Sequence, residues 1–106
     1  REGLAICNKP RVKTKRYLPP CMKDWEIIWV EDVTASVFYQ YPYASKWIGL
    51  NMLSVNSKTV IMDTAQTELS NTLEKKGFTV IPHTLRHSRT LGGGHHCVTL
   101  DTWRED

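Results

Sequence analysis

The residues best suited to chemistry lie near the end of the sequence, in the run Gly92-Gly93-Gly94-His95-His96-Cys97. Consecutive glycines disfavour regular structure, and they let the backbone take positive φ or approach a ligand closely. A cysteine becomes a strong nucleophile where cationic neighbours or backbone N–H groups stabilise its thiolate. The run therefore predicts that Cys97 is a nucleophile held at a glycine corner.

Side chains that could stabilise a thiolate surround Cys97 in the sequence: His95, His96, Arg86 and Arg89. The alternative is a buried, inert cysteine in a strand beside a glycine turn. Residues 98–100, Val-Thr-Leu, have the composition of a strand, so Cys97 is expected where the glycine corner enters it.

Two other sites could use the same region, and we predict neither. Zinc could be bound by His83, His87 and the residues of the 95–97 run. However, the chain has no Cys-x-x-Cys pair, and Pro82 opposes a helix carrying the first two histidines. A phosphate-binding P-loop would need Gly-Lys-Ser/Thr after the glycines, and this is absent.

The segment 47–81 predicts the order strand, strand, helix, strand. Trp47–Val55 is expected to be a largely buried strand, and 56–58 supplies turn residues before a partner strand over Thr59–Met62. A further strand is expected over Phe78–Ile81. The fold class is therefore α/β.

The helix of this unit has start and stop signals. Asp63 occupies an N-cap position with Gln66 at capping-box spacing. An apolar stripe recurs every fourth residue, at Ala65, Leu69 and Leu73. Gly77 follows where a left-handed cap residue belongs.

Earlier in the chain, Leu4–Cys7 and Trp25–Val30 are expected to be strands, and Val33–Tyr43 a loop. The double proline Pro19-Pro20 interrupts the chain between the two strands.

Composition excludes several function classes. No apolar run approaches the roughly 20 residues that cross a bilayer, so no membrane partner is expected. The net charge is +3 over 106 residues, with a basic cluster between residues 9 and 23. Acidic residues follow the cluster closely, which favours a solvated face over a nucleic-acid partner. Three cysteines without framework spacing favour a reducing, cytoplasmic location over a disulfide scaffold.

The segment Leu91–Asp101 resembles the C-terminal nucleophile motif of the amidinotransferases, which include the glycine and inosamine-phosphate types. The likeness continues through Ser45–Asn51 and Asp63–Gln66, and reaches Arg1–Arg11. The block of glycine, histidine and cysteine is highly specific, and the other stretches support it.

This resemblance implies a pentein fold, a five-bladed α/β-propeller built from ββαβ modules. The unit at 47–81 would be one module and 83–101 the nucleophile segment. Residues 1–106 would then be the C-terminal portion of a single catalytic domain, with about one and a half to two modules.

The resemblance also implies the reaction. A thiolate attacks the guanidinium carbon of arginine and expels ornithine, and the amidino-cysteine passes its group to a small amine acceptor. Arginine and that amine would be the partners, and no cofactor is expected. In related hydrolases water replaces the amine, so a deiminase-like hydrolase is the alternative enzyme. A non-catalytic binding or structural module with the same fold is the alternative outside enzymes.

Carried over residue by residue, Cys97 would be the nucleophile, with His96, Gly93 and Gly94 in supporting positions beside it. Arg11 would hold a substrate carboxylate, which its planar fork suits. Ser45 matches one of two adjacent serines that contact substrate, while the other position is Ala44 here. Read without the resemblance, Arg11 belongs to the basic face and Ser45 to a turn or cap.

The family's catalytic histidine lies just upstream of the residues that match Arg1, and its carboxylate partners lie near it or earlier. We therefore expect the 106 residues alone to be inactive. A propeller module without its neighbours would expose faces that are otherwise buried, so self-association or a homo-oligomer is also expected.

Overall fold

The computed structural model describes residues 1–34, 45–87 and 91–105. The chain divides into two compact units, Arg1–Asp32 and Val33–Asp106, and each is described by itself. The predicted loop over Val33–Tyr43 lies, apart from its first two residues, outside the described residues. No helix among the described residues has both the length and the apolar character to span a bilayer.

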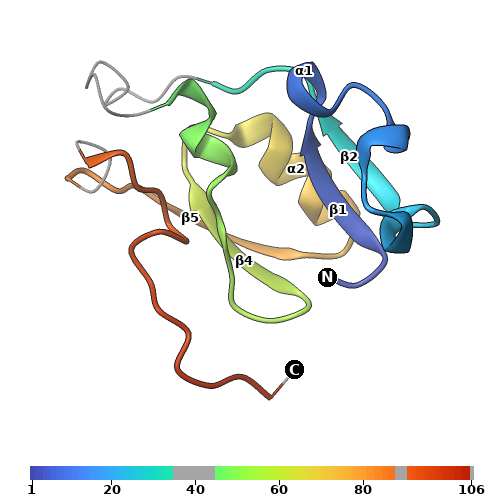
Figure 1. The fold of residues 1–106 in the computed structure, drawn as a ribbon. Coiled ribbons are helices and arrows are strands. Elements are labelled where there is room, and N and C mark those ends of the chain that lie inside the picture. The colour runs from blue at the N-terminus through green and yellow to red at the C-terminus, as the bar shows by residue number, and fades with distance from the viewer. Residues whose placement is uncertain (35–44, 88–90, 106) are drawn as a thin grey trace. The chain divides into compact units, whose positions relative to one another are not determined.

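The first unit contains two parallel strands, β1 (Leu4–Asn8) and β2 (Glu26–Val30), which confirms both predicted strands (Figure 1). Their register pairs Leu4 with Glu26 and Asn8 with Val30. The connection holds a short helix, α1 (Lys9–Val12), and two 3-10 turns at Lys15–Tyr17 and Pro20–Met22. Each 3-10 turn is a single turn, as expected in a segment that the double proline interrupts.

Helix α1 begins where β1 ends because Asn8 caps it. The side-chain oxygen of Asn8 accepts a hydrogen bond from the backbone N–H of Arg11, and Pro10 lies in the first turn. Both are typical of helix starts. Arg11 is thereby placed on a short, exposed helix.

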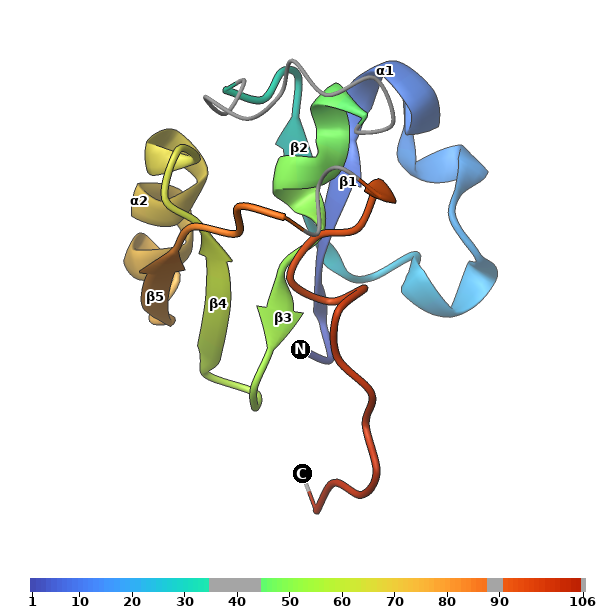
Figure 2. The ribbon, with the colours of Figure 1, turned by 90° about the vertical axis from the view of Figure 1, so that its left-hand side faces the viewer.

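The second unit contains β3 (Leu53–Ser54), β4 (Thr59–Asp63), α2 (Thr67–Lys75) and β5 (Thr79–His83). The sheet order is β3-β4-β5, with β3 antiparallel to β4 and β4 parallel to β5 (Figure 2). Helix α2 makes the crossover between the two parallel strands and packs on β5. The predicted ββαβ order is confirmed.

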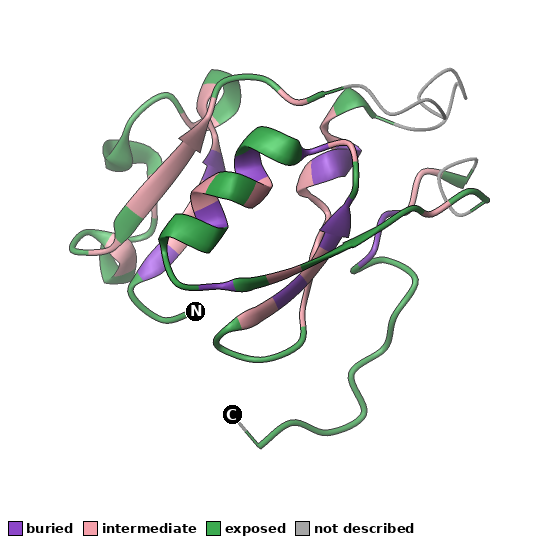
Figure 3. Cartoon of the chain, turned by 180° about the vertical axis from the view of Figure 1, so that it is seen from behind, coloured by how far each residue is buried: buried purple, intermediate pink, exposed green. Residues whose placement is uncertain are grey.

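The core of this unit lies between α2 and β4. Met62 of β4 and Leu73 of α2 are almost completely buried, with 0% and 1% of their surfaces exposed. The other buried apolar residues described in this unit are Ile48, Val60, Leu69 and Phe78 (Figure 3). Burying an apolar side chain of this size contributes roughly 1.5–3 kcal/mol. Leu69 and Leu73 of the predicted stripe therefore form the packing face of the helix, whereas Ala65, its first member, lies before the helix and is half-buried.

The predicted strand over Trp47–Val55 is largely wrong. Lys46–Leu50 form a 3-10 helix, and only Leu53–Ser54 are a strand. The physical reason is a local cap: the Ser45 hydroxyl accepts a hydrogen bond from the N–H of Trp47 at 3.2 Å. Such a cap offers the backbone an alternative to a sheet ladder.

The predicted N-cap at Asp63 is also wrong. Asp63 is the last residue of β4, its carboxylate accepts a hydrogen bond from the N–H of Ala65, and the helix begins at Thr67 after Gln66. The amide of Gln66 instead bonds to the backbone of Thr34. The Asp63 side chain therefore makes a turn before the helix.

The end of α2 is as predicted. Gly77 has φ of +83°, and its N–H donates to the carbonyl of Glu74. The N–H of Phe78 donates to the carbonyl of Leu73. These two bonds are those of a Schellman motif.

Candidate active site

Cys97 lies in an exposed turn rather than at the start of a strand. The N–H of Val98 donates to the carbonyl of Gly94, and that of Thr99 to the carbonyl of His96. Val98 and Leu100 have 52% and 87% of their surfaces exposed, so the strand predicted for 98–100 is wrong. Cys97 itself is exposed and is a free thiol. These facts contradict the alternative of a buried cysteine in a strand.

Asn51 organises this turn, a role that the sequence did not reveal. It follows the 3-10 helix Lys46–Leu50, and its carbonyl accepts a hydrogen bond from the N–H of His95 at 2.9 Å. Its side-chain oxygen accepts from the N–H groups of His96 and Cys97, at 3.0 and 3.1 Å. Its Nδ2 donates to Cys97 Sγ at 3.1 Å.

The glycines allow this close approach. A Cβ on Gly94 would lie 2.6 Å from the Cβ of Asn51, closer than real side chains come. Gly92 has φ of +83°, which other residues rarely adopt. The glycine run was predicted to let the backbone approach a ligand, and here it approaches a side chain of the same chain. Gly93 lies between the two and is half-buried.

The two histidines beside Cys97 differ in placement. His95 has 6% of its surface exposed, and its Nε2 lies 3.3 Å from Nδ1 of His83 at the end of β5. The two rings meet edge to face, with centroids 5.4 Å apart. His95 therefore ties the turn to the sheet.

His96 is exposed, and its carbonyl accepts from the hydroxyl of Thr99. Within the described residues the Cys97 sulfur has one hydrogen-bonding partner, Nδ2 of Asn51. Of the other side chains predicted to stabilise the thiolate, Arg86 is exposed and Arg89 lies outside the described residues. The supporting role predicted for His96 stays a prediction.

Ser45 and Arg11, the two predicted substrate contacts, are both exposed. Ser45 is the N-cap of the 3-10 helix that leads to Asn51. This is the local role expected from its position, and it leaves the substrate contact untested. Arg11 belongs to the first unit, so its predicted role near Cys97 also stays a prediction.

Across residues 1–34, 45–87 and 91–105, no three His, Cys, Asp or Glu side chains gather in an arrangement that could hold a metal ion.

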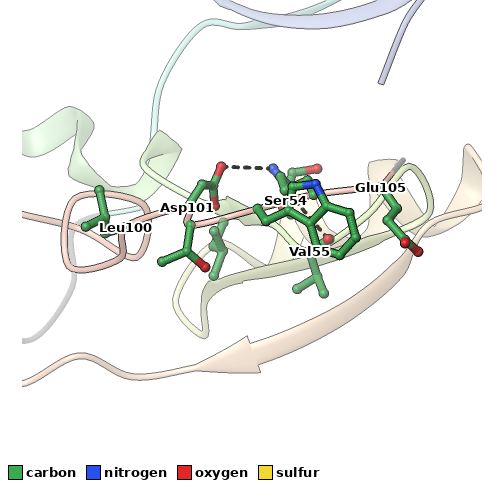
Figure 4. A pocket seen from close by; sticks show the side chains of 9 residues that line it. Ser54, Val55, Leu100, Asp101 and Glu105 are labelled. Atoms are coloured by element: carbon green, nitrogen blue, oxygen red, sulfur yellow. Dashed lines mark hydrogen bonds and ion pairs between the residues drawn. The ribbon is translucent and has the colours of Figure 1, made fainter.

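A shallow pocket of about 390 Å³ lies between β3 and the C-terminal segment, lined by residues 53–55 and 100–105 (Figure 4). Arg104 links the two sides of the pocket, since it donates to the carbonyls of Ser54 and Val55 and lies 3.4 Å from Asp101. Cys97 is not among the lining residues, so this pocket is separate from the nucleophile.

Comparisons with known proteins relate the chain to the amidinotransferases. No family model matches the chain. The chain is 42% identical over 105 residues to inosamine-phosphate amidinotransferase 1 of Streptomyces griseus, covering 98% of this chain and 30% of that protein. It is 39% identical over 61 residues to the mitochondrial glycine amidinotransferase of Xenopus tropicalis, covering 58% of this chain and 14% of the relative.

A solved structure of an inosamine-phosphate amidinotransferase from Streptomyces griseus matches with a TM-score of 0.88 and 40% identity. The match covers all of this chain and 30% of the solved one. The chain thus spans about 30% of the length of the inosamine-phosphate enzyme. The structure is a mixed α/β segment that matches part of the solved enzyme.

Proposed function

Because this chain belongs to the amidinotransferase family, we propose that it supplies the nucleophile of an amidino-group transfer from arginine to a small amine. The observation that carries the proposal is the presentation of Cys97. The thiol is free and exposed on a turn, and its sulfur accepts a hydrogen bond from Asn51. An exposed sulfur that receives a donor is suited to act as a thiolate nucleophile.

The proposed reaction has two steps. The Cys97 thiolate forms a bond to the guanidinium carbon of arginine, and the proton lost by the thiol returns to the side-chain nitrogen that leaves with ornithine. The bond between that nitrogen and the guanidinium carbon breaks, which leaves a cationic amidino group on the sulfur. The acceptor amine then attacks the same carbon, loses a proton, and expels the thiolate.

Two other residues are proposed to contact the substrates. Arg11 would bind a substrate carboxylate through its guanidinium, and its exposed position on a short helix leaves that group available. Ser45 would offer its hydroxyl while its oxygen caps the 3-10 helix that precedes Asn51. We further propose that His96, with Gly93 and Gly94, supports the nucleophile.

The ββαβ unit is proposed to be one module of a five-bladed propeller of the pentein type. The observed order β3-β4-α2-β5 has the composition of such a module, with one antiparallel pair and one parallel pair. The parallel strands β1 and β2 would belong to a neighbouring module. Residues 1–106 would together form the C-terminal portion of one catalytic domain.

The proton transfers need a general acid and base, and the described residues offer none bonded to the Cys97 sulfur. We therefore propose that the 106 residues alone do not turn over, and that activity belongs to the longest natural polypeptide that contains them. That polypeptide is the sample for every experiment below unless another is named.

The test is an intact-mass spectrum after incubation with arginine labelled in the guanidino carbon. We expect one labelled amidino adduct on the polypeptide and none on its Cys97→Ala variant. Cys21→Ala is the matched control, because Cys21 is also an exposed free cysteine, and it should keep the adduct. A folded polypeptide without any adduct would favour the non-catalytic module instead.

The acceptor step is tested by adding a small amine and following the label. Label on the amine together with released ornithine supports transfer. Label in citrulline would mean that water replaces the amine and that the protein is a deiminase-like hydrolase. Transfer by the isolated 106 residues would contradict the proposal that they are inactive alone.

A further inference from the structure

We propose that Asn51 is a further functional residue of this site, which donates a hydrogen bond to the Cys97 thiolate and holds the turn that carries it. The inference concerns how the nucleophile is prepared, and it rests on the proposed function only for its role in catalysis. The hydrogen bonds between Asn51 and residues 95–97 support this role.

The orientation of the Asn51 amide is fixed by its neighbours. Two backbone N–H groups, those of His96 and Cys97, donate to the side-chain oxygen at 3.0 and 3.1 Å. A rotated amide would place an NH₂ group against these two donors and lose both bonds. The NH₂ group must therefore be the one that faces Cys97 Sγ, at 3.1 Å.

Asn51 is itself held in place by the helix that precedes it. Its backbone N–H donates to the carbonyl of Ile48 at 2.9 Å, which closes the 3-10 helix. Its carbonyl accepts from the N–H of His95. The donor to the sulfur is thus positioned from both sides before any substrate arrives, as preorganised electrostatic stabilisation requires.

The contact with Gly94 shows how tightly the turn encloses Asn51. A Cβ at Gly94 would lie 2.6 Å from the Cβ and 2.7 Å from the side-chain oxygen of Asn51. The absence of a side chain at this position is what lets the two N–H groups reach that oxygen.

A hydrogen bond to an anion is stronger than one to a neutral atom. The Asn51 donor therefore favours the sulfur when it carries negative charge. The sulfur carries that charge before it attacks arginine, and again when the acceptor amine expels it. In the amidino-cysteine between these steps the sulfur is not an anion, so the bond weakens. Asn51 would assist both the formation and the release of the intermediate.

Two histidines near Cys97 can also carry charge. The ring of His95 is bonded to His83, and His96 is exposed on the turn next to Cys97. Neither histidine is substituted in the variants below.

The test is the rate at which iodoacetamide alkylates Cys97, measured by peptide mass spectrometry between about pH 6 and pH 9. The key variant is Asn51→Asp, which keeps an oxygen for the two N–H groups but places a second oxygen against the sulfur. Asn71→Asp is the matched control, because it makes the same chemical change at an exposed position of α2. All samples carry Cys21→Ser to remove the other exposed thiol.

We expect Asn51→Asp to slow alkylation at neutral pH by roughly tenfold or more and to shift the profile toward higher pH. Asn71→Asp should leave the profile unchanged. Gly94→Ala, which pushes Asn51 from the turn without altering its amide, should shift the profile in the same direction. This second variant keeps the inference testable if Asn51→Asp does not fold.

An Asn51→Asp profile that coincides with that of Asn71→Asp would overturn the inference. Because the new carboxylate repels the thiolate by its charge alone, support also requires a shift in Gly94→Ala, which adds no charge. An unshifted Gly94→Ala profile would overturn the inference as well. The assay uses no arginine, so it separates the two proposals. A shifted profile without an amidino adduct would support the role of Asn51 and reject the transfer reaction. An amidino adduct together with an unshifted profile would support the transfer reaction and reject the role of Asn51.

Discussion

Gly49 lies against the side chain of Gln66 so closely that a Cβ on Gly49 would fall 2.5 Å from Nε2 of Gln66. The same amide group donates to the carbonyl of Thr34 at 2.6 Å and accepts from its N–H at 3.1 Å. Gln66 is 4% exposed. A missing side chain in the 3-10 helix thus makes room for a buried amide that fixes Thr34.

We expect Gly49→Ala to lower the free energy of unfolding by about 1–3 kcal/mol, because the new methyl group must displace the Gln66 amide. Urea denaturation measures the change. Gly49→Ala should lower the free energy of unfolding less in a Gln66→Ser background, where the clashing atoms are absent. An equal cost in both backgrounds would show that the contact is not the cause.

A substitution at Gly77 measures the cost of a left-handed backbone conformation in the absence of a steric clash. Its φ is +83°, and nothing lies within 4 Å of a Cβ placed on it. Gly77→Ala should therefore cost about 1–2 kcal/mol from the left-handed conformation alone. Gly77→Asn should cost less, since asparagine tolerates this region better. Thermal unfolding of the two variants ranks them, and the opposite order would reject the explanation.

Cys7 and Cys21 should differ in reactivity. Burial raises the pKa of the Cys7 thiol above its ordinary value of 9.0, whereas Cys21 is exposed. Under native conditions at about pH 8, iodoacetamide should label Cys21 well before Cys7. Labelling in urea should remove the difference. Equal native rates would contradict the burial of Cys7.

The raised pKa of Cys7 also sets the sign of a pH effect on stability. The folded state favours the neutral thiol, so the unfolded chain loses its proton at a lower pH than the folded chain does. The contribution of Cys7 is therefore present below the ordinary thiol pKa and is lost as the pH rises through the raised value. A Cys7→Ala variant should lose less stability than the parent over that range.

We expect His95 to contribute mainly to the stability of the fold. His95→Ala should lower the free energy of unfolding by about 1–3 kcal/mol, because it leaves a cavity and removes the bond to His83. His96→Ala is the matched control on an exposed neighbour and should have little effect on stability. Urea denaturation compares the two, and equal losses would show that burial does not distinguish them.

The sequence predicts correctly those elements whose pattern lies within a single helix, strand or turn. The leucine spacing of α2, the glycine after it and the strands β1, β2, β4 and β5 all follow from residues within one element. The order β3-β4-α2-β5 was predicted for the same reason. Cys97 is a candidate nucleophile on the sequence alone because the glycines and histidines that mark it adjoin it in the chain.

The wrong predictions have two causes, local side-chain caps and contacts between distant segments. The apolar run from Trp47 resembles a strand, but the Ser45 cap and the room needed by Gln66 favour a helical turn. The turn at Cys97 is built on Asn51, 46 residues earlier, and no pattern within either segment records that pairing. An asparagine within an apolar run was the one available signal, since such residues often bond to nearby backbone.

The separation between Asn51 and Cys97 has a consequence for biosynthesis. Translation completes the 3-10 helix and the Asn51 that follows it before Cys97 is made, and the thiol meets its donor only when the two segments pack together. Until then Cys97 is an ordinary cysteine on an unfolded segment, with the low reactivity toward electrophiles and oxidants of an unactivated thiol at neutral pH. The proposed donor to Cys97 is thus absent from the newly synthesised chain until the two segments have folded together.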